Sequence, residues 1–496
     1  MNAYQQLEAR KKRTSALGNA MGILEWDQQT MMPEGAAPAR ASVLAELSVW
    51  MHEMETGPEL SDLIAAAEAD ADQLNEWQRA NLREMRHEFI HANAMPAELV
   101  EKIVLAESES EMAWRTARPN NDWKGLAPKL EVLFTLKREE AAIKSGLMGV
   151  SPYEAMIDQY DPGRREAQVD QIFGDLEQFL PGFVQEVMEK QASAPQALIP
   201  NGPFPTEKQE ALSKAVMKIF GFPFERGRLD TAHHPFSGGA DGDIRITTRY
   251  EEDDFMKSLM AVIHETGHAL YEDGRPAEWL GQPVGNSRGM TLHESQSLLL
   301  EMQASRSEEF IRFLVPTIKR CLDGEGPAWE ADNILRIYRK VEPGLIRVYA
   351  DEVTYPLHVI LRYKLEKAII ANEIAIDDLP GAWNELMEKL LGIRPKDDID
   401  GVMQDVHWPA GLFGYFPTYS LGALTSAQIF TAAQRDNSDI LPGLGRGDCT
   451  PLFSWLDQHI RSKGCLYMPD ELIEKATGSA LDTAAFKASI KARYLD

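Results

Sequence analysis

Apolar residues recur at intervals of three and four along most of the chain, which is the spacing of amphipathic helices. Charged side chains occupy the opposite faces of these segments. The pattern therefore predicts a mainly α protein. The predicted helices cover residues 41–54, 76–91, 126–144, 165–191, 255–274, 290–310, 329–340, 345–355, 356–371 and 382–391.

Only one stretch alternates as a strand does. In residues 244–250, Ile244, Ile246 and Thr248 fall on one side and polar or charged residues on the other. A strand just ahead of a helix could bind a peptide backbone along its edge. Residues 401–422 have no clean period and mix glycine, proline and aromatic residues, which predicts a loop that shapes a site.

A long connection is predicted at residues 192–206, which are rich in alanine, proline, glycine and asparagine. It divides an N-terminal helical half, residues 1–200, from a second half, residues 201–496. No internal repeat is evident in either half.

Composition and charge narrow the functional classes. With 44% hydrophobic and 26% charged residues the chain reads as an ordinary globular protein. We expect no signal peptide and no membrane-spanning segment. The net charge of −26 argues against nucleic acid or an anionic membrane as a partner. Three scattered cysteines form no disulfide framework, so we expect a reducing, cytoplasmic location.

The chemistry is concentrated in His264-Glu265-Thr266-Gly267-His268, an H-E-x-x-H sequence inside the predicted helix 255–274. On a helix, His264 and His268 leave the same face one turn apart and can share one metal ion. Glu265 lies about 100° around the helix, where a base could act on water beside the metal. The alternative is a core helix with two hydrogen-bonded histidines.

A catalytic metal of this kind needs a third protein ligand. Glu294 begins the next long helix and could return to the metal through a helical hairpin. Equally, Thr291 and Glu294 fit a capping box, in which Glu294 would bind backbone N–H groups. His293 is another candidate ligand, although it faces a different direction. The residues alone leave these choices open.

Six sequence blocks occur in the order found in metallocarboxypeptidases of the carboxypeptidase Taq type, a family of H-E-x-x-H gluzincin peptidases. The chain thus resembles that family in residues 234–236 (HPF), 243–247 (DIRIT), 264–268 (HETGH), 293–297 (HESQS), 346–351 (IRVYAD) and 401–408 (GVMQDVHW). Residues 26–35 (WDQQTMMPEG) also resemble the N-terminal region of these enzymes.

The resemblance implies a fold and an activity. The fold would be a single all-helical saddle with a deep substrate groove, similar to angiotensin-converting enzyme and neurolysin. Residues 1–200 would form one groove wall, and residues 201–496 the metal-bearing catalytic half. The activity would be removal of C-terminal amino acids, one at a time and with broad specificity, from peptides with a free C-terminal carboxylate. The resemblance also implies Zn²⁺ or Co²⁺ as the metal and a homodimer.

The resemblance further assigns His264, His268 and Glu294 to the metal and the general base to Glu265. It implies that Arg347 binds the substrate carboxylate, since arginine binds carboxylates in a bidentate manner. From the residues alone, an ordinary salt bridge from Arg347 to Asp351, four residues on, is favoured.

The oxyanion of the reaction also needs a donor. His407 and a nearby tyrosine, Tyr419 ahead of Tyr415, are the candidates, with packing of both tyrosines as the alternative. Asp405 could orient His407 or a metal ligand. His234 and Arg245 also match family positions; Arg245 could contact substrate or pair with Asp243.

Two competing functions use the same residues. One is an oligopeptidase or dipeptidyl carboxypeptidase with the same zinc chemistry, in which the carboxylate-binding arginine would lie further from the metal. The other is a non-catalytic peptide-binding scaffold with a structural zinc, against which Glu265 argues because a structural site needs no base.

Overall fold

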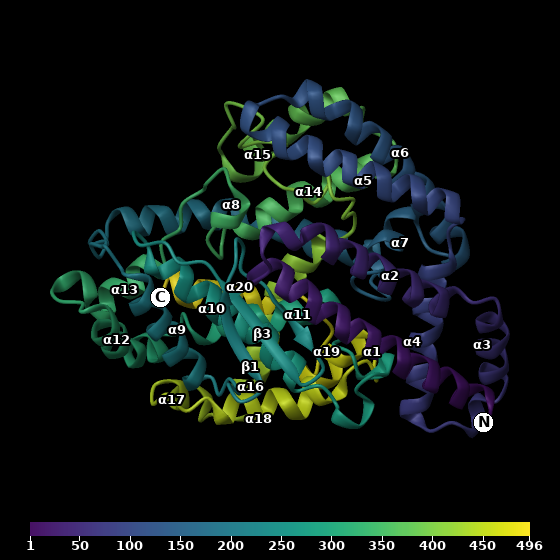
Figure 1. Cartoon of the computed structure of the whole chain (residues 1–496). Helices are drawn as coiled ribbons and strands as arrows, with labels where there is room; N and C mark the ends of the chain where they lie inside the picture. Colours follow the sequence, from purple (N-terminus) through teal and green to yellow (C-terminus); the bar gives the residue numbers. More distant parts are fainter.

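Helices make up most of the molecule in the computed structural model, which describes residues 1–496 (Figure 1). The mainly α class is therefore confirmed. Nine α-helices precede the sheet: α1 (Ala3–Thr30), α2 (Ala37–Thr56), α3 (Glu59–Ala69), α4 (Glu76–Asn93), α5 (Ala97–Ala117), α6 (Trp123–Met148), α7 (Pro152–Asp158), α8 (Glu166–Ala192) and α9 (Thr206–Ile219). The helices after the sheet are α10 (Phe255–Asp273), α11 (Gly289–Leu298), α12 (Glu308–Leu322), α13 (Ala331–Tyr338), α14 (Tyr355–Ile370), α15 (Leu379–Leu391), α16 (Pro417–Asp436), α17 (Ile440–Leu444), α18 (Thr450–His459), α19 (Pro469–Thr477) and α20 (Ala484–Tyr494).

The strand predicted at 244–250 is confirmed as β3 (Asp243–Thr248). It is the central strand of a small sheet, with β1 (Gly227–Thr231) parallel on one side and β2 (Ser237–Ala240) antiparallel on the other. Both edges of β3 are occupied, so the expectation that this strand pairs with a peptide is wrong. The partner strands escaped prediction because β2 reads Ser-Gly-Gly-Ala, a composition that is rare in strands.

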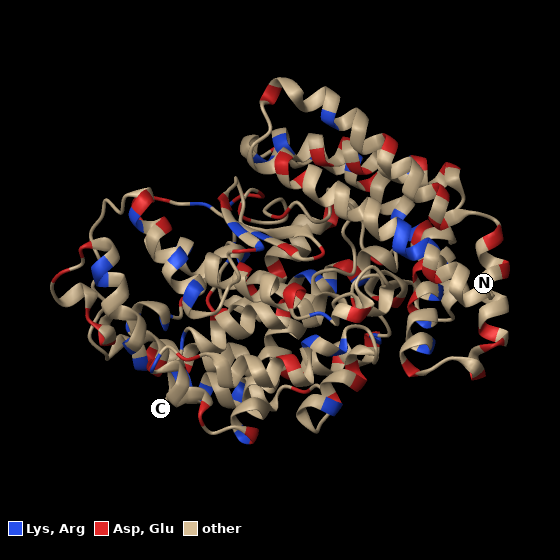
Figure 2. Ribbon diagram, turned by 60° about the horizontal axis from the view of Figure 1, so that its bottom comes forward, with Lys and Arg blue, Asp and Glu red and all other residues tan.

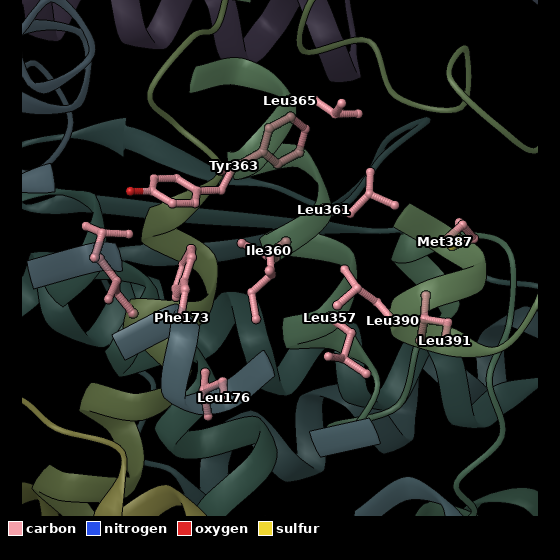
Figure 3. Packing of buried hydrophobic residues seen from close by; sticks show 14 of the residues in the cluster. Phe173, Leu176, Leu357, Ile360, Leu361, Tyr363, Leu365, Met387, Leu390 and Leu391 are labelled. Carbon is pink, nitrogen blue, oxygen red and sulfur yellow. The ribbon is translucent and has the colours of Figure 1, made fainter. Parts of the chain in front are cut away.

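The largest hydrophobic core joins helices that are distant in sequence. Figure 3 shows Phe173 and Leu176 of α8 packed against Leu357 and Ile360 of α14, with Met387 of α15 close by. Burying one such leucine contributes about 1.5–3 kcal/mol. This core includes residues from 117 to 494, so it spans both sides of residue 200. A second core surrounds α10 and α12.

Two of the predicted helices differ from the structure. The prediction of a helix at 345–355 is wrong, because only a 3-10 turn forms there, at Arg347–Tyr349. Asp351 accepts the backbone N–H groups of Val353 and Thr354 and so stabilises a turn instead. The helix expected at 290–310 is α11 followed by a π-helical turn, Leu299–Ala304. The aromatic segment 401–422 is a loop only as far as Phe416, because α16 begins at Pro417.

Acidic and basic residues are interspersed along the helices (Figure 2). The acidic excess gives the chain its net charge of −26. None of the helices combines the length and the apolar composition needed to cross a membrane.

Candidate active site

Helix α10 carries the H-E-x-x-H residues. Its first turn is capped by Asp254, whose Oδ1 accepts the N–H of Met256 at 3.0 Å. Gly267 allows α11 to approach closely, because a Cβ atom there would lie 2.5 Å from the carbonyl oxygen of Gln296. The glycine inside the motif is therefore a packing requirement that brings α11, and Glu294 with it, onto the histidines.

His264, His268 and Glu294 converge in space. The Nε2 atoms of His264 and His268 lie 3.8 and 3.4 Å from Oε2 of Glu294. The capping-box alternative is wrong, because α11 begins at Gly289 and the Thr291 hydroxyl donates instead to Asp161 at 2.8 Å. These two imidazoles and one carboxylate are a group that could hold a divalent metal ion.

The outward nitrogen of each imidazole is already engaged. Nδ1 of His264 donates to Glu301 Oε2 at 2.9 Å, and Arg306 donates to the other oxygen of Glu301. Nδ1 of His268 lies 2.6 Å from Nδ1 of His293, whose Nε2 donates to Glu272 at 2.7 Å.

These contacts fix the tautomers of the two candidate ligands. A neutral His293 that donates from Nε2 must accept at Nδ1, so His268 carries its proton on Nδ1. His268 thus presents a bare Nε2 to the centre, which is the form that binds a metal. His264, which donates from Nδ1 to Glu301, presents the same bare Nε2 once a metal displaces its second proton. His293 is not a ligand in this arrangement; it supports His268.

The electrostatics of the centre follow from burial and from the carboxylates. Burial by itself lowers the pKa of His264, but Glu294 and Glu301 outweigh it and raise that pKa to about 10. The pKa of Glu294 falls to about 2, since His264 and His268 outweigh its burial. Burial raises the pKa of Glu265 to about 7, with opposition from His264 and reinforcement from Glu294. A carboxylate with a pKa near the working pH suits general acid–base chemistry.

A cavity of about 600 Å³ opens onto these groups. Most of the predicted site residues share it, including Arg347, Tyr415 and Tyr419, whereas His407 and Arg245 do not line it. The lining residues are Pro235, Phe236, Ser237, His264, Glu265, His268, Met290, His293, Glu294, Arg347, Val348, Tyr355, Tyr415 and Tyr419.

Arg347 is held by the carboxylate of Asp405, which belongs to the aromatic segment 401–422. Its Nε and Nη2 donate to Asp405 Oδ1 at 3.1 and 2.8 Å, and its Nη1 donates to the Tyr355 hydroxyl at 3.0 Å. The alternative salt bridge to Asp351 is therefore wrong. Arg362 binds the other oxygen of Asp405. Two guanidinium groups share one carboxylate, which leaves a surplus positive charge beside the cavity.

The loop that carries Asp405 is fastened by a buried carboxylate, Glu366 of α14. Its oxygens accept the indole N–H of Trp408 at 2.9 Å, the backbone N–H of Gly414 at 3.0 Å and the Tyr153 hydroxyl at 2.6 Å. Gly414 has φ +82°, and a Cβ atom there would lie 2.5 Å from the Met156 backbone. Glu366 therefore holds both ends of the segment between His407 and Tyr415.

The two predicted residues that lie outside the cavity are His407 and Arg245. Nε2 of His407 lies 3.3 Å from the Tyr419 hydroxyl, and burial lowers the pKa of His407 to about 4. Tyr419 stands in the first turn of α16, at the cavity. Arg245 pairs with Asp243 through two hydrogen bonds. Of the two predicted roles of Arg245, a substrate contact or a pair with Asp243, the structure contains the second.

Comparison with known proteins identifies the family. A family model described as carboxypeptidase Taq (M32) metallopeptidase matches residues 6–494. The chain belongs to the M32 family. Thermostable carboxypeptidase 1 of Thermus thermophilus is 37% identical over 99% of this chain and 98% of its own. Among solved structures, metallocarboxypeptidase 1 of Trypanosoma cruzi has a TM-score of 0.98 at 40% identity, covering 100% of this chain and 99% of its own. The M32 carboxypeptidase of Deinococcus radiodurans has a TM-score of 0.94 at 34% identity, covering 99% and 98%.

Several residues around this M32 site were not predicted from the sequence. Tyr355, Glu301 and Glu366 act through contacts between distant segments, for which no local pattern exists. A second cluster, His87, His91 and Asp158, did have a local signal. His87-Glu88-Phe89-Ile90-His91 is itself an H-E-x-x-H sequence in the predicted helix 76–91.

Proposed function

We propose that this M32 family member is a metal-dependent carboxypeptidase that releases C-terminal amino acids from peptides one at a time. One observation carries the proposal: a single cavity contains a metal-ligand set, a base beside it and a buried arginine with surplus positive charge. The metal donors suit peptide-bond hydrolysis, and the arginine suits the substrate's terminal carboxylate.

His264, His268 and Glu294 would hold the metal, for which we propose Zn²⁺, with Co²⁺ as an alternative. A divalent ion at this position supplies a Lewis acid that activates water and polarises the scissile carbonyl. Glu265 takes a proton from the attacking water and passes it to the leaving amine. Glu301 and His293 keep the two imidazoles in the ligating tautomer.

Arg347 would bind the C-terminal carboxylate. Three of its five side-chain N–H groups are used by Asp405 and Tyr355, so two remain for a ligand. Arg362 neutralises the second oxygen of Asp405, which keeps that carboxylate from cancelling the charge of Arg347. Because the whole chain is acidic, this local surplus is what draws an anionic terminus into the cavity.

The Tyr419 hydroxyl would donate to the oxyanion that forms as the peptide bond is attacked. His407 fixes this hydroxyl from behind, and Asp405 links the same loop to Arg347. Tyr415 lies edge-on to Tyr419, with ring centroids 5.2 Å apart, and would contact the substrate side chain. A substrate contact for Arg245 stays a prediction.

We also propose the finer features that family resemblance implies. Residues 1–200 would form one wall of a substrate groove in a saddle similar to angiotensin-converting enzyme and neurolysin. A second cavity of about 460 Å³ supports this division, since α1 and β2 both line it and it shares Ser237 and His293 with the metal cavity. A homodimer is proposed on the same basis. Three free cysteines agree with a cytoplasmic location.

Mass spectrometry of a metal-loaded digestion tests the function. We expect a ladder of single C-terminal losses from a peptide acid, strongly suppressed by C-terminal amidation. Losses of dipeptides or internal cuts would retain the metal chemistry but refute the placement of Arg347 one residue from the scissile bond. Tight metal binding without any cleavage would indicate a peptide-binding scaffold instead.

A further inference from the structure

Helix α4 and the end of α7 build a second cluster of metal-ligating side chains. His87 and His91 are one turn apart on α4, and their Nε2 atoms lie 2.6 and 3.0 Å from the same oxygen of Asp158. The other oxygen of Asp158 accepts the backbone N–H of Gly163 at 2.8 Å, which fixes the orientation of the carboxylate. The donors thus come from two segments about 70 residues apart in sequence.

Asp158 forms no ion pair with a lysine or an arginine. The residue is only 8% exposed, and its side-chain ion-pair partners are the two histidines, with no lysine or arginine among them. Other enclosed carboxylates do have such a partner: Asp405 pairs with Arg347 and Arg362, and Asp161 pairs with Arg164. A buried carboxylate is stable when a cation is paired with it, so this cluster has room for one positive charge.

We propose that His87, His91 and Asp158 bind a second divalent transition-metal ion, of the zinc class, in a structural role. Tetrahedral ligands 2.0–2.1 Å from such an ion are about 3.3 Å apart, so the donors need to separate by less than about 1 Å. Each imidazole would move its proton to Nδ1 to free Nε2. The imidazole–carboxylate set favours Zn²⁺, Ni²⁺ or Cu²⁺ over Mg²⁺ or Ca²⁺.

The role is structural because the base position of this motif is already engaged. Glu88, the counterpart of Glu265, pairs with Lys11 of α1 at 2.6 Å. A carboxylate bound to lysine is a poor acceptor for a proton from water. The nitrogen Nδ1 of His91 is buried without a hydrogen-bond partner, so this site lacks the outer support found at His264 and should bind its ion more weakly.

An ion here would tie α4 to the segment that positions a catalytic ligand. Residues 158–164 contact the start of α11, where Met290 N–H donates to the Tyr160 carbonyl at 2.7 Å and Thr291 donates to Asp161. Glu294 lies one turn further along α11. The ion would therefore fasten the N-terminal helices to the base of α11.

Metal counting on the full-length chain tests the proposal. Chelator-treated protein is titrated with Zn²⁺, and separately with Co²⁺ followed by visible absorption. We expect two equivalents for the wild type, the second weaker, and one for the double variant His87→Gln/His91→Gln. Glutamine places an N–H donor where Nε2 stood, so the contact with Asp158 survives while the ligands are lost.

Two further variants keep the test decisive. His264→Gln/His268→Gln should retain one equivalent, and His233→Gln, which alters an exposed histidine, should retain two. A wild type that binds one equivalent, or a His87→Gln/His91→Gln protein that still binds two, would overturn the proposal. Because the wild type is counted directly, the conclusion stands even if one variant fails to fold.

Discussion

Helices α4 and α10 each carry an H-E-x-x-H sequence whose histidines face a carboxylate from another helix. In α10 the two Nε2 atoms lie 3.8 and 3.4 Å from Glu294, whereas in α4 they lie 2.6 and 3.0 Å from Asp158. The first set has the spacing of metal ligands and the second has the spacing of hydrogen bonds. Identical local spacing therefore produces two different sites.

The difference comes from what surrounds each helix. At α10, Glu301 and His293 hold the outward nitrogens, Glu265 lines a cavity, and Arg347 stands in the same cavity. At α4, the outward nitrogen of His91 is unpartnered, and Lys11 binds the glutamate of the motif. The H-E-x-x-H sequence supplies a pair of histidines in each helix. The neighbouring elements determine whether a base and a substrate-binding cavity lie beside that pair.

The sharpest contrast concerns the glutamate of each motif. Glu265→Gln should lower kcat/KM on a peptide acid by about 10²–10⁴-fold, because the general base is lost. Metal content should be unchanged, since Glu265 is not a ligand. The matched variant Glu88→Gln should leave kcat/KM near the wild-type value. Equal losses in the two variants would remove the distinction between the helices.

Arg347→Lys tests the carboxylate-binding role at α10. Lysine keeps the charge but cannot replace the guanidinium fork that binds Asp405 and Tyr355 and, as proposed, the substrate carboxylate. We expect kcat/KM for a peptide acid to fall by about 10²-fold, equivalent to about 3 kcal/mol. Activity on the amidated peptide, already low, should hardly change. A uniform loss on both peptides would refute the carboxylate contact.

Glu301→Gln should make α10 resemble α4. Without a carboxylate on its Nδ1, His264 loses basicity and orientation, and metal affinity should fall by about 10–100-fold. Competition with a chromophoric chelator measures this affinity directly. Glu309→Gln, on the exposed surface of α12, is the control and should bind metal as the wild type does. Unchanged affinity would mean that Glu301 has only a structural contact.

Glu366→Gln should affect catalysis without affecting the metal. The amide cannot accept all three donors, Trp408, Gly414 and Tyr153, so the loop bearing Asp405 and His407 loosens. We expect about a 10-fold fall in kcat/KM, from one lost hydrogen bond to a charged group. Tyr153→Phe, which removes only the tyrosine donor, should fall less. Loss of metal in Glu366→Gln would point to general unfolding instead.

Sequence patterns predicted those features that depend on local spacing. The helical period predicted α10 and its i,i+4 histidine pair, and the alternation of residues 244–250 predicted β3. The helix predicted at 345–355 failed because Asp351 satisfies turn N–H groups, a competing use of a short carboxylate that periodicity ignores.

Contacts between distant segments could not be predicted in this way. The residues alone favour a pair between Arg347 and Asp351, but Arg347 binds Asp405, 58 residues away. The same holds for Glu366 and Trp408, which meet only after α14 packs under the loop. The M32 resemblance favoured Glu294 as a metal ligand. The spacing of the residues alone favoured neither a metal ligand nor a helix-capping residue at this position.

The smallest expected effect is on the pH dependence of stability, to which the histidines of α4 and α10 contribute differently. Burial, with Lys144 and His87 nearby, lowers the pKa of His91 below its ordinary 6.5 despite the hydrogen bond to Asp158, whereas Glu294 and Glu301 raise that of His264. Metal-free folded protein then binds fewer protons at His91 than the unfolded chain does, so stability falls as pH drops below 6.5. His91→Gln should narrow the difference in unfolding midpoint between pH 7.5 and pH 5.5, values chosen about one unit either side of a histidine's usual pKa. A wild type that gains stability from this residue on acidification would instead indicate a protonated His91–Asp158 ion pair.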